Sequence, residues 1–232
     1  MTIRTLDTLI DKQDTFEIVR DQIAAILLAE TAAQQVLAPL AIPPQDPDDW
    51  KFDVFLEASN PFEKFLNNEN IADADLTPIV NVWYETSDFS LGKGDVVNRQ
   101  QPEGLFNIDI YGAGISEQKE STQDCGDKVA AFEAQRMVRL ARNILMSAIN
   151  VNLQLKGVVG RRWVRSVTMF QPQINQQTAV QIVGARILFA VEFVETSPQV
   201  VGVMLDEVGY ELKRASDGQV NLVADFVGLE DE

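Results

Sequence analysis

The chain has 232 residues, of which 46% are hydrophobic and 23% charged, a composition typical of a folded globular protein rather than a disordered one. Its net charge of −16 argues against wholesale nucleic-acid binding, because displacing counterions from phosphates needs a positive surface. It has no histidine and a single cysteine, Cys125, which excludes an internal disulfide, His–Cys zinc sites and catalysis by a Ser-His or Cys-His pair within the chain. The N-terminus lacks a signal-peptide pattern and no apolar run of 18 residues occurs, so we expect a soluble protein made in a reducing cytoplasm.

The first patterned segment is a helix followed by a proline-rich arm. Asp14 and Glu17 have the spacing of a helix N-cap with its reciprocal glutamate, and apolar residues follow at helical intervals as far as Leu37. Pro39 ends this helix, and the segment to Trp50 holds four prolines and three aspartates. Residues 1–50 are therefore predicted to form an N-terminal helix and an extended surface arm.

The core domain is predicted over residues 51–200. Alternation of apolar and polar residues predicts strands at 51–57 and 79–86, with a short helix capped by Asn60 between them. The connection at 91–104 is long and contains three glycines, and such a loop usually carries a function or becomes ordered on a partner.

A strand and a long helix lie at the centre of the chain. Residues 105–111 alternate as in a half-buried strand, and Gly112-Ala113-Gly114 predicts a turn that ends it. After a polar loop, residues 127–150 contain neither proline nor glycine and predict a helix of about six and a half turns.

This helix has two unlike faces. One arc is apolar and comprises Val129, Met137, Leu140, Ala141, Ile144, Leu145 and Ala148. The opposite side comprises Lys128, Gln135, Arg136, Arg139, Arg142 and Asn143. We expect the apolar arc to cover a sheet that includes the central strand, and the basic side to face outward.

Positive charge is concentrated in and just after the helix. Residues 128–165 hold eight basic residues and one acid, a net charge of +7, whereas the rest of the chain holds 11 bases and 34 acids, a net charge of −23. The molecule is therefore expected to have two electrically different sides.

The remaining pattern is all strand. Strands are predicted at 162–170 and 180–195, and a hairpin at 208–226 with Ser216-Asp217-Gly218 at its turn, so residues 201–232 form a C-terminal hairpin and acidic tail. Short links favour antiparallel pairing. The predicted fold class is α+β: a mixed, mostly antiparallel sheet with the 127–150 helix packed on one face, an extra N-terminal helix and a C-terminal hairpin.

No catalytic or cofactor motif is convincing. Gly112-Ala113-Gly114 resembles the start of a dinucleotide fingerprint, but Glu117 stands at the third glycine position, so a plain turn is favoured. Asp109 and Glu192 on predicted strands are the first pair to test for Mg²⁺ binding or acid–base work, although strand carboxylates are more often solvated. We expect no enzyme, cofactor or metal site, and keep a carboxylate-based metal-dependent hydrolase as an alternative.

The basic segment offers a candidate interface. Its predicted members are Lys128, Arg136, Arg139, Arg142, Arg161, Arg162 and Arg165. They form either a solvated surface or a docking face for an acidic neighbour, such as another copy of the chain in a closed ring or a single partner of a soluble adaptor.

Four segments together resemble the tail terminator, or tail-completion, proteins of long-tailed bacteriophages. They are Val80 to Tyr84, Phe106 to Gly112, Arg136 to Leu145 and Arg186 to Phe193, and the likeness covers about Pro78 to Glu195. The resemblance implies a small α+β domain without catalysis that assembles as a hexameric ring, caps the tail tube and joins the tail to the head or neck.

The same resemblance implies the partners and the location. These are other copies of the chain, tail tube, sheath or neck and connector proteins, and double-stranded DNA that passes without specific binding. The protein would be assembled in the host cytoplasm and reside in the virion, without a membrane. The N-terminal helix, its arm and the C-terminal hairpin depart from the pattern, so another neck component, a connector or a stopper, stays open.

Overall fold

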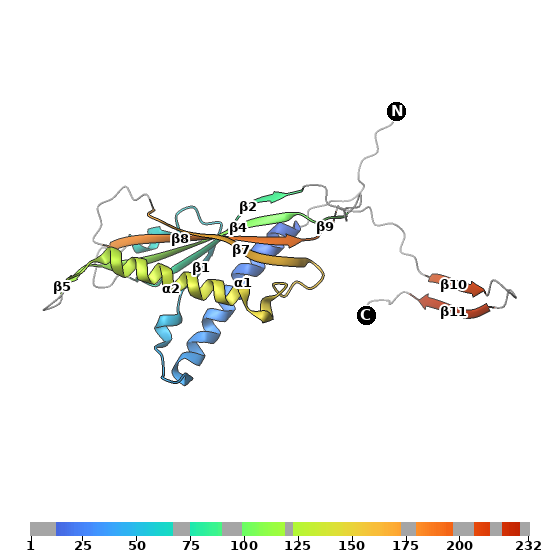
Figure 1. The fold of residues 1–232 in the computed structure, drawn as a ribbon, viewed down its shortest axis with the longest axis horizontal. Coiled ribbons are helices and arrows are strands. Elements are labelled where there is room, and N and C mark those ends of the chain that lie inside the picture. Colours follow the sequence, from blue (N-terminus) through green and yellow to red (C-terminus); the bar gives the residue numbers. More distant parts are fainter. Residues whose placement is uncertain are drawn as a thin grey trace, which may run out of the picture. The chain divides into compact units, whose positions relative to one another are not determined.

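The computed structural model describes residues 13–66, 75–89, 99–118, 123–172 and 180–196, together with the backbone of two C-terminal strands at 207–213 and 220–227. The chain divides into two compact units, one spanning Asp11–Thr196 and the other containing the C-terminal strands. The N-terminal helix therefore belongs to the same unit as the central sheet (Figure 1).

A five-stranded sheet in the order β1-β2-β4-β8-β7 is the centre of the larger unit. Its strands are β1 (Asp53–Leu56), β2 (Ile79–Asp88), β4 (Glu103–Ile115), β7 (Val159–Phe170) and β8 (Val180–Phe193). The pair β1 and β2 is parallel, and every other neighbouring pair is antiparallel. The predicted α+β class with a mixed, mostly antiparallel sheet is confirmed. Two short ladders extend it, β3 (Arg99–Gln100) with β9 (Glu195–Thr196) and β5 (Glu117–Gln118) with β6 (Gln123–Asp124).

The N-terminal helix, α1, spans Thr15–Leu37 and begins where the cap pattern predicted it, with the Glu17 carboxylate accepting a hydrogen bond from the Asp14 N–H at 2.8 Å. Two 3-10 helices follow, η1 (Ala38–Leu40) and η2 (Pro47–Trp50). The predicted arm is thus partly folded and returns along α1, because the Thr31 hydroxyl donates to the Trp50 carbonyl at 2.5 Å.

The central helix, α2, spans Gly126–Met146 and is followed by η5 (Ala148–Asn150). It ends four residues earlier than predicted because Ser147 takes an extended conformation, with ψ 153°. Its buried side also differs from the predicted arc: Ala130 and Ala134 are fully buried, whereas Val129 is 37% exposed.

The predicted turn at Gly112-Ala113-Gly114 is wrong, since β4 runs straight through it to Ile115. A Cβ atom on Gly112 would lie 2.4 Å from the Ala130 carbonyl oxygen, and one on Gly114 would lie 2.4 Å from the Gly126 carbonyl oxygen. The two glycines therefore serve close approach of helix and strand rather than a change of direction.

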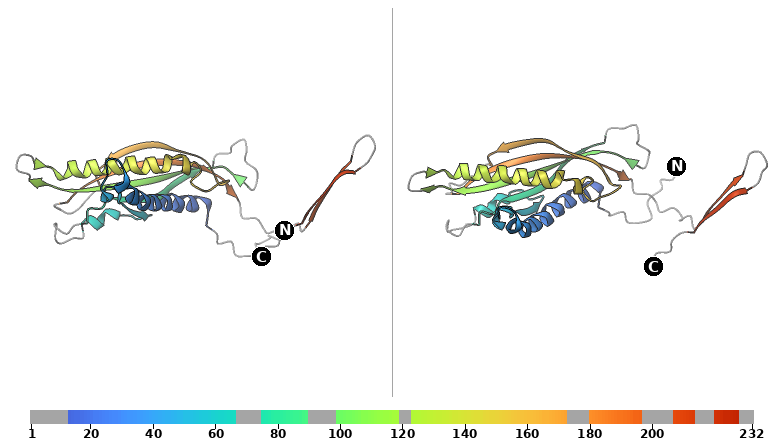
Figure 2. Two further views of the ribbon diagram at one scale, coloured as in Figure 1. Left: turned by 90° about the horizontal axis from the view of Figure 1, so that it is seen from below. Right: turned by 60° about the horizontal axis from the view of Figure 1, so that its bottom comes forward.

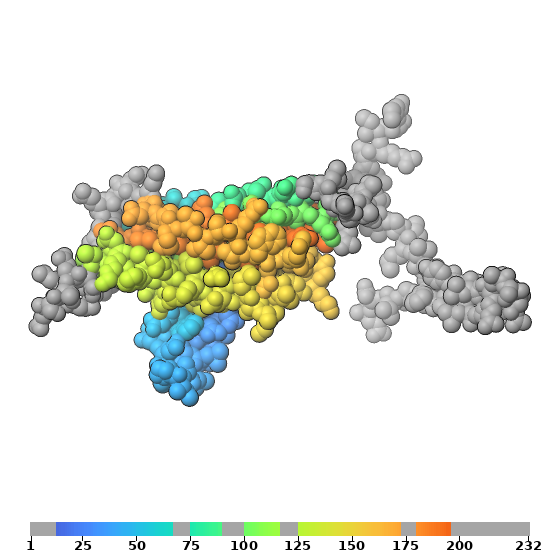
Figure 3. Space-filling view, in the orientation of Figure 1, coloured from blue at the N-terminus to red at the C-terminus, as the bar shows by residue number. Residues whose placement is uncertain are grey.

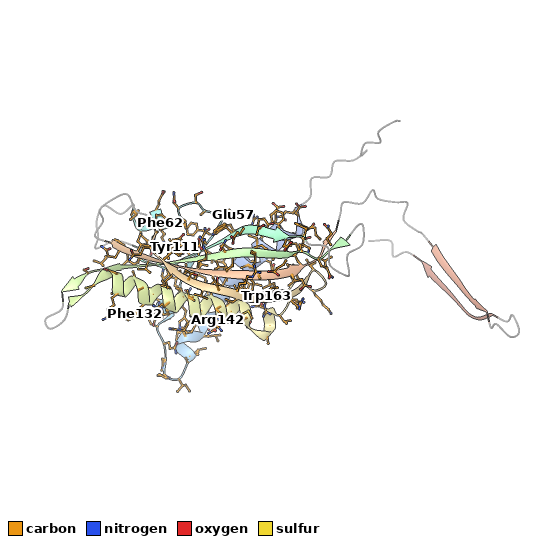
Figure 4. All side chains as sticks on the ribbon, turned by 45° about the horizontal axis from the view of Figure 1, so that its top comes forward. Glu57, Phe62, Tyr111, Phe132, Arg142 and Trp163 are labelled. Carbon is orange, nitrogen blue, oxygen red and sulfur yellow. The ribbon has the colours of Figure 1, made fainter. Side chains whose placement is uncertain are left out.

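Both helices cover the same face of the sheet (Figure 2). Val19, Ile23 and Leu27 of α1 and Met137 and Leu145 of α2 share one apolar core with the inward residues of β2, β4 and β8. On the opposite face, η3 (Pro61–Phe65) covers one end, where Phe62 packs on Tyr111 with ring centroids 5.5 Å apart (Figure 4).

The C-terminal unit contains two antiparallel strands, β10 (Glu207–Lys213) and β11 (Val220–Val227). They agree with the predicted hairpin in position and pairing. Its predicted turn at Ser216-Asp217-Gly218 lies outside the described residues, as does most of the 91–104 connection.

Candidate docking surfaces

The outward side of α2, which we call the outer α2 face, mixes basic and apolar side chains. It consists of the exposed residues Lys128, Val129, Phe132, Gln135, Arg139, Arg142, Asn143 and Met146, and the acidic Asp127 is exposed beside it in the first turn. Small residues on the buried side hold the helix close to β4, so the long side chains are left on the solvent side. Figure 4 shows Phe132 and Arg142 along this side of α2.

Two guanidinium groups on this face are available for a partner. Arg139 and Arg142 are exposed, and within the described part of the chain neither makes an ion pair. Lys128 lies over the ring of Phe132, with its Nζ 5.9 Å from the centroid, and that ring is itself 59% exposed. Charge and an exposed aromatic ring on one helix face are typical of residues that anchor protein interfaces.

Arg136, by contrast, is engaged within the chain. Its Nη1 lies 2.5 Å from Asp49 Oδ1 and its Nη2 lies 2.8 Å from Glu133 Oε2. Because Asp49 belongs to η2, this ion pair links the arm to α2.

The other predicted interface residues lie away from the outer α2 face. Arg161 pairs with Glu192 at 2.7 Å and Arg165 with Glu103 at 3.4 Å, all on the sheet face opposite the helices. The basic segment is therefore divided between two sides of the sheet and does not form one surface.

Arg162 fixes the end of α2. It donates hydrogen bonds to the carbonyl oxygens of Leu145 at 2.7 Å, Ser147 at 2.7 Å and Val151 at 3.0 Å, and burial lowers its pKa. Leu145 lies in the last turn of α2, where carbonyl groups lack a helical N–H partner, so the guanidinium takes the place of a glycine cap there; the Ser147 carbonyl also accepts from the Asn150 N–H at 3.1 Å.

We expect Arg162→Met to lower the free energy of unfolding by about 2 kcal/mol, because three carbonyls lose a charged donor. Urea denaturation measures this loss. Arg165→Met is the matched control on the same strand, with an expected loss below about 1 kcal/mol since its ion pair is half-exposed. Equal losses in the two variants would remove the capping role of Arg162.

The C-terminal part of α1 and the arm that follows it, together residues 28–50, expose large apolar side chains. The residues that are more than half exposed are Leu28, Val36, Leu37, Leu40 and Ile42. In the space-filling view the blue end of α1 and the following residues project beyond α2 (Figure 3). Where exposed apolar side chains form a contiguous patch, they mark contact sites for other proteins or membranes.

The segment Thr15–Leu40 is long and apolar enough to cross a membrane, because an 18-residue window within it has a mean hydropathy of 1.5; the sequence-based expectation did not include such a segment. In this fold its first half lies against the sheet, where Val19, Ile23 and Leu27 are fully buried. Core helices of globular proteins pass the same test of length and composition, so the test alone does not indicate a membrane span.

A groove runs between the arm and α2. It consists of two hollows of about 300 and 270 Å³ that share Trp50, Leu140 and Asn143. Its floor is apolar, with Ile26 and Ile144, and its margins carry amides, carboxylates and Arg139. An apolar floor with polar margins suits a segment of polypeptide better than it suits acid–base chemistry.

A charged cluster is buried on the sheet face opposite the helices. Asp109 is 3% exposed and receives two hydrogen bonds from Arg186, at 2.6 and 2.7 Å, and one from Trp83 Nε1 at 3.0 Å. The hydrogen bond to Asp109 raises the pKa of Arg186, whose guanidinium also lies 5.0 Å from the Trp83 ring centroid. Burial, with the Asp109 charge, raises the pKa of nearby Tyr111 to about 12. Both Asp109 oxygens accept hydrogen bonds from these side chains, so the cluster links β2, β4 and β8.

The pair Asp109 and Glu192, singled out for acid–base or metal work, is not brought together. Asp109 is opposite Arg186 in the ladder and Glu192 lies six residues further along β8, about 20 Å away. Each carboxylate binds its own arginine. Among the described residues no group of three potential metal-ligating side chains occurs.

Sequence reasoning missed Phe132 and the apolar arm as surface features. Phe132 falls between the basic residues on the helical wheel, so its exposure could have been inferred. The exposure of Leu40 and Ile42 could not, because it depends on how the arm folds back.

A scan against protein-family models found no match, and a search of curated proteins found none either.

Proposed function

We propose that this chain is a structural subunit of a long-tailed bacteriophage that forms a ring as a tail terminator, capping the tail tube and joining it to the neck. The observation that carries the proposal is the outer α2 face, where Arg139, Arg142 and Phe132 are all exposed. The chain as a whole carries a net charge of −16, so this basic face stands out from it. A basic patch and an acidic surface on one subunit complement each other between copies.

Contacts between unlike patches of identical subunits are head-to-tail, and such contacts close into rings when the rotation permits. In a ring of this kind the outer α2 face of one copy meets an acidic surface of the next. The acidic surface left over faces the channel and repels the DNA backbone, so DNA passes without binding. The same logic would serve a connector or stopper ring of the neck.

The double variant Arg139→Glu with Arg142→Glu is expected to remain folded and to lose assembly. Both side chains are exposed on the helix, so the fold does not need them, whereas reversing them places like charges across the contact. Sedimentation velocity measures the assembly and circular dichroism the fold.

The matched control is Lys51→Glu with Lys156→Glu, which changes the net charge equally at two exposed positions off α2. It is expected to assemble like the unmodified chain. Normal assembly of the Arg139 and Arg142 variant would exclude the outer α2 face as the docking surface.

A further inference from the structure

The C-terminal hairpin has a two-faced residue pattern. Strand pairing places Val208 opposite Phe226, Tyr210 opposite Ala224 and Leu212 opposite Leu222, so these alternate positions share one face and all six are apolar. The positions of the other face are mixed: they carry three acids, Glu207, Glu211 and Asp225, one base, Lys213, and the valines that the register pairs with them, Val220, Val223 and Val227. A hairpin of two strands is at best marginally stable alone, and an apolar face needs cover.

Strand β7 offers a long edge to such a hairpin. It is 12 residues long and last in the sheet, and among the described residues no strand pairs with its outer side. An open edge of backbone donors and acceptors is a template for another strand.

The two faces of β7 differ as those of the hairpin do. Val167 and Met169 are opposite the core residues Ile187 and Ala185, so they lie on the helix-covered face, yet they are 44% and 41% exposed. The opposite face carries the arginine side chains Arg161 and Arg165, 76% and 49% exposed.

We propose that the hairpin of one copy adds to the β7 edge of a neighbouring copy and extends its sheet. Its apolar face then continues the helix-covered face beyond Val167 and Met169, and the face that carries Glu207, Glu211 and Asp225 lies beside Arg161 and Arg165. Backbone hydrogen bonds along the edge supply binding, and the match of both faces fixes which way the hairpin lies. This inference rests on the proposed ring and names one of its contacts.

The occupant is the hairpin of a second copy. Among the described residues of the larger unit, Asp11–Thr196, no strand pairs with the outer edge of β7, which leaves that edge open to a strand from a neighbouring copy. The hairpin and the β7 edge are two different surfaces of the same chain. A contact between the hairpin of one copy and the β7 edge of the next is therefore head-to-tail, which is the kind of contact that a ring requires.

Cysteine cross-linking tests the contact in the full chain. The exposed Cys125 is first replaced by serine, and chains carrying Val167→Cys are mixed with chains carrying Leu212→Cys and treated with a short bis-maleimide. A product of twice the chain mass is expected, and a chain with both cysteines should give a ladder of multiples. The control pairs Leu212→Cys with Ile42→Cys, which is 99% exposed on the arm and should give no product.

A product of single-chain mass from the double variant would overturn the inference, because the hairpin would then dock on its own β7. Absence of any product would overturn it too. If light scattering finds a ring while the Val167 and Leu212 cysteines fail to cross-link, the contact proposed here is wrong and the ring proposal is unaffected.

Discussion

Gly112→Val is expected to be among the most destabilising single substitutions in the chain, lowering the free energy of unfolding by at least about 3 kcal/mol. The new Cβ would lie 2.4 Å from the Ala130 carbonyl oxygen and 2.7 Å from the Ala134 nitrogen, both backbone atoms of α2. Backbone atoms of a helix cannot move aside as the end of a side chain can, so the helix must move away from the sheet. Urea denaturation of the purified variant measures the loss.

Gly160→Val is the matched control for this prediction. It places the same side chain in another strand, where a Cβ would meet only the Glu192 carbonyl oxygen, at 3.7 Å. Its expected change is within about 0.5 kcal/mol. If both variants unfold at the same urea concentration, the claim that Gly112 is needed for the close approach of α2 to β4 is wrong.

Arg186→Met is expected to lower the free energy of unfolding by about 3 kcal/mol, the low end for a broken buried pair. The Asp109 side chain is 5% exposed and would keep only the Trp83 N–H as a donor. Arg186 is itself 41% exposed, so water replaces part of what is lost. Thermal and urea unfolding at neutral pH measure the effect.

Two further variants show whether the loss of stability comes from leaving a buried carboxylate unpaired or from removing an arginine as such. Arg161→Met removes an exposed partner of Glu192 and should cost less than about 1 kcal/mol. Adding Asp109→Leu to Arg186→Met should recover part of the stability, because no buried charge is then left unpaired. A double variant less stable than Arg186→Met alone would contradict this account.

Most of the secondary structure could be predicted because its signals are local. The α1 cap depends on Asp14 and Glu17 alone, and alternation along β8 is visible in the sequence. The glycines of β4 were wrongly predicted to form a turn, because the sequence does not distinguish a glycine in a turn from one in a strand. Only the position of α2 against Gly112 and Gly114 shows that they allow close packing. For the same reason Ala130 was missed and Val129 was wrongly placed in the core, since small residues are buried here by close approach.

The docking surfaces could be predicted only in part. The exposed basic side of α2 follows from its periodicity, and Arg139 and Arg142 lie where the wheel places them. The roles of Arg136 and Arg162 depend on residues up to 87 positions away, such as Asp49, and no helical wheel contains that information. Nor could the sequence reveal that Arg161 and Arg165 face the other side of the sheet.

The mass of the purified chain in solution tests the central claim most directly. Multi-angle light scattering over a range of protein and salt concentrations should find a ring of six 25.8 kDa chains, about 155 kDa, that dissociates as salt screens the contact between basic and acidic surfaces. A mass of 25.8 kDa at every concentration, including low salt, would contradict the ring.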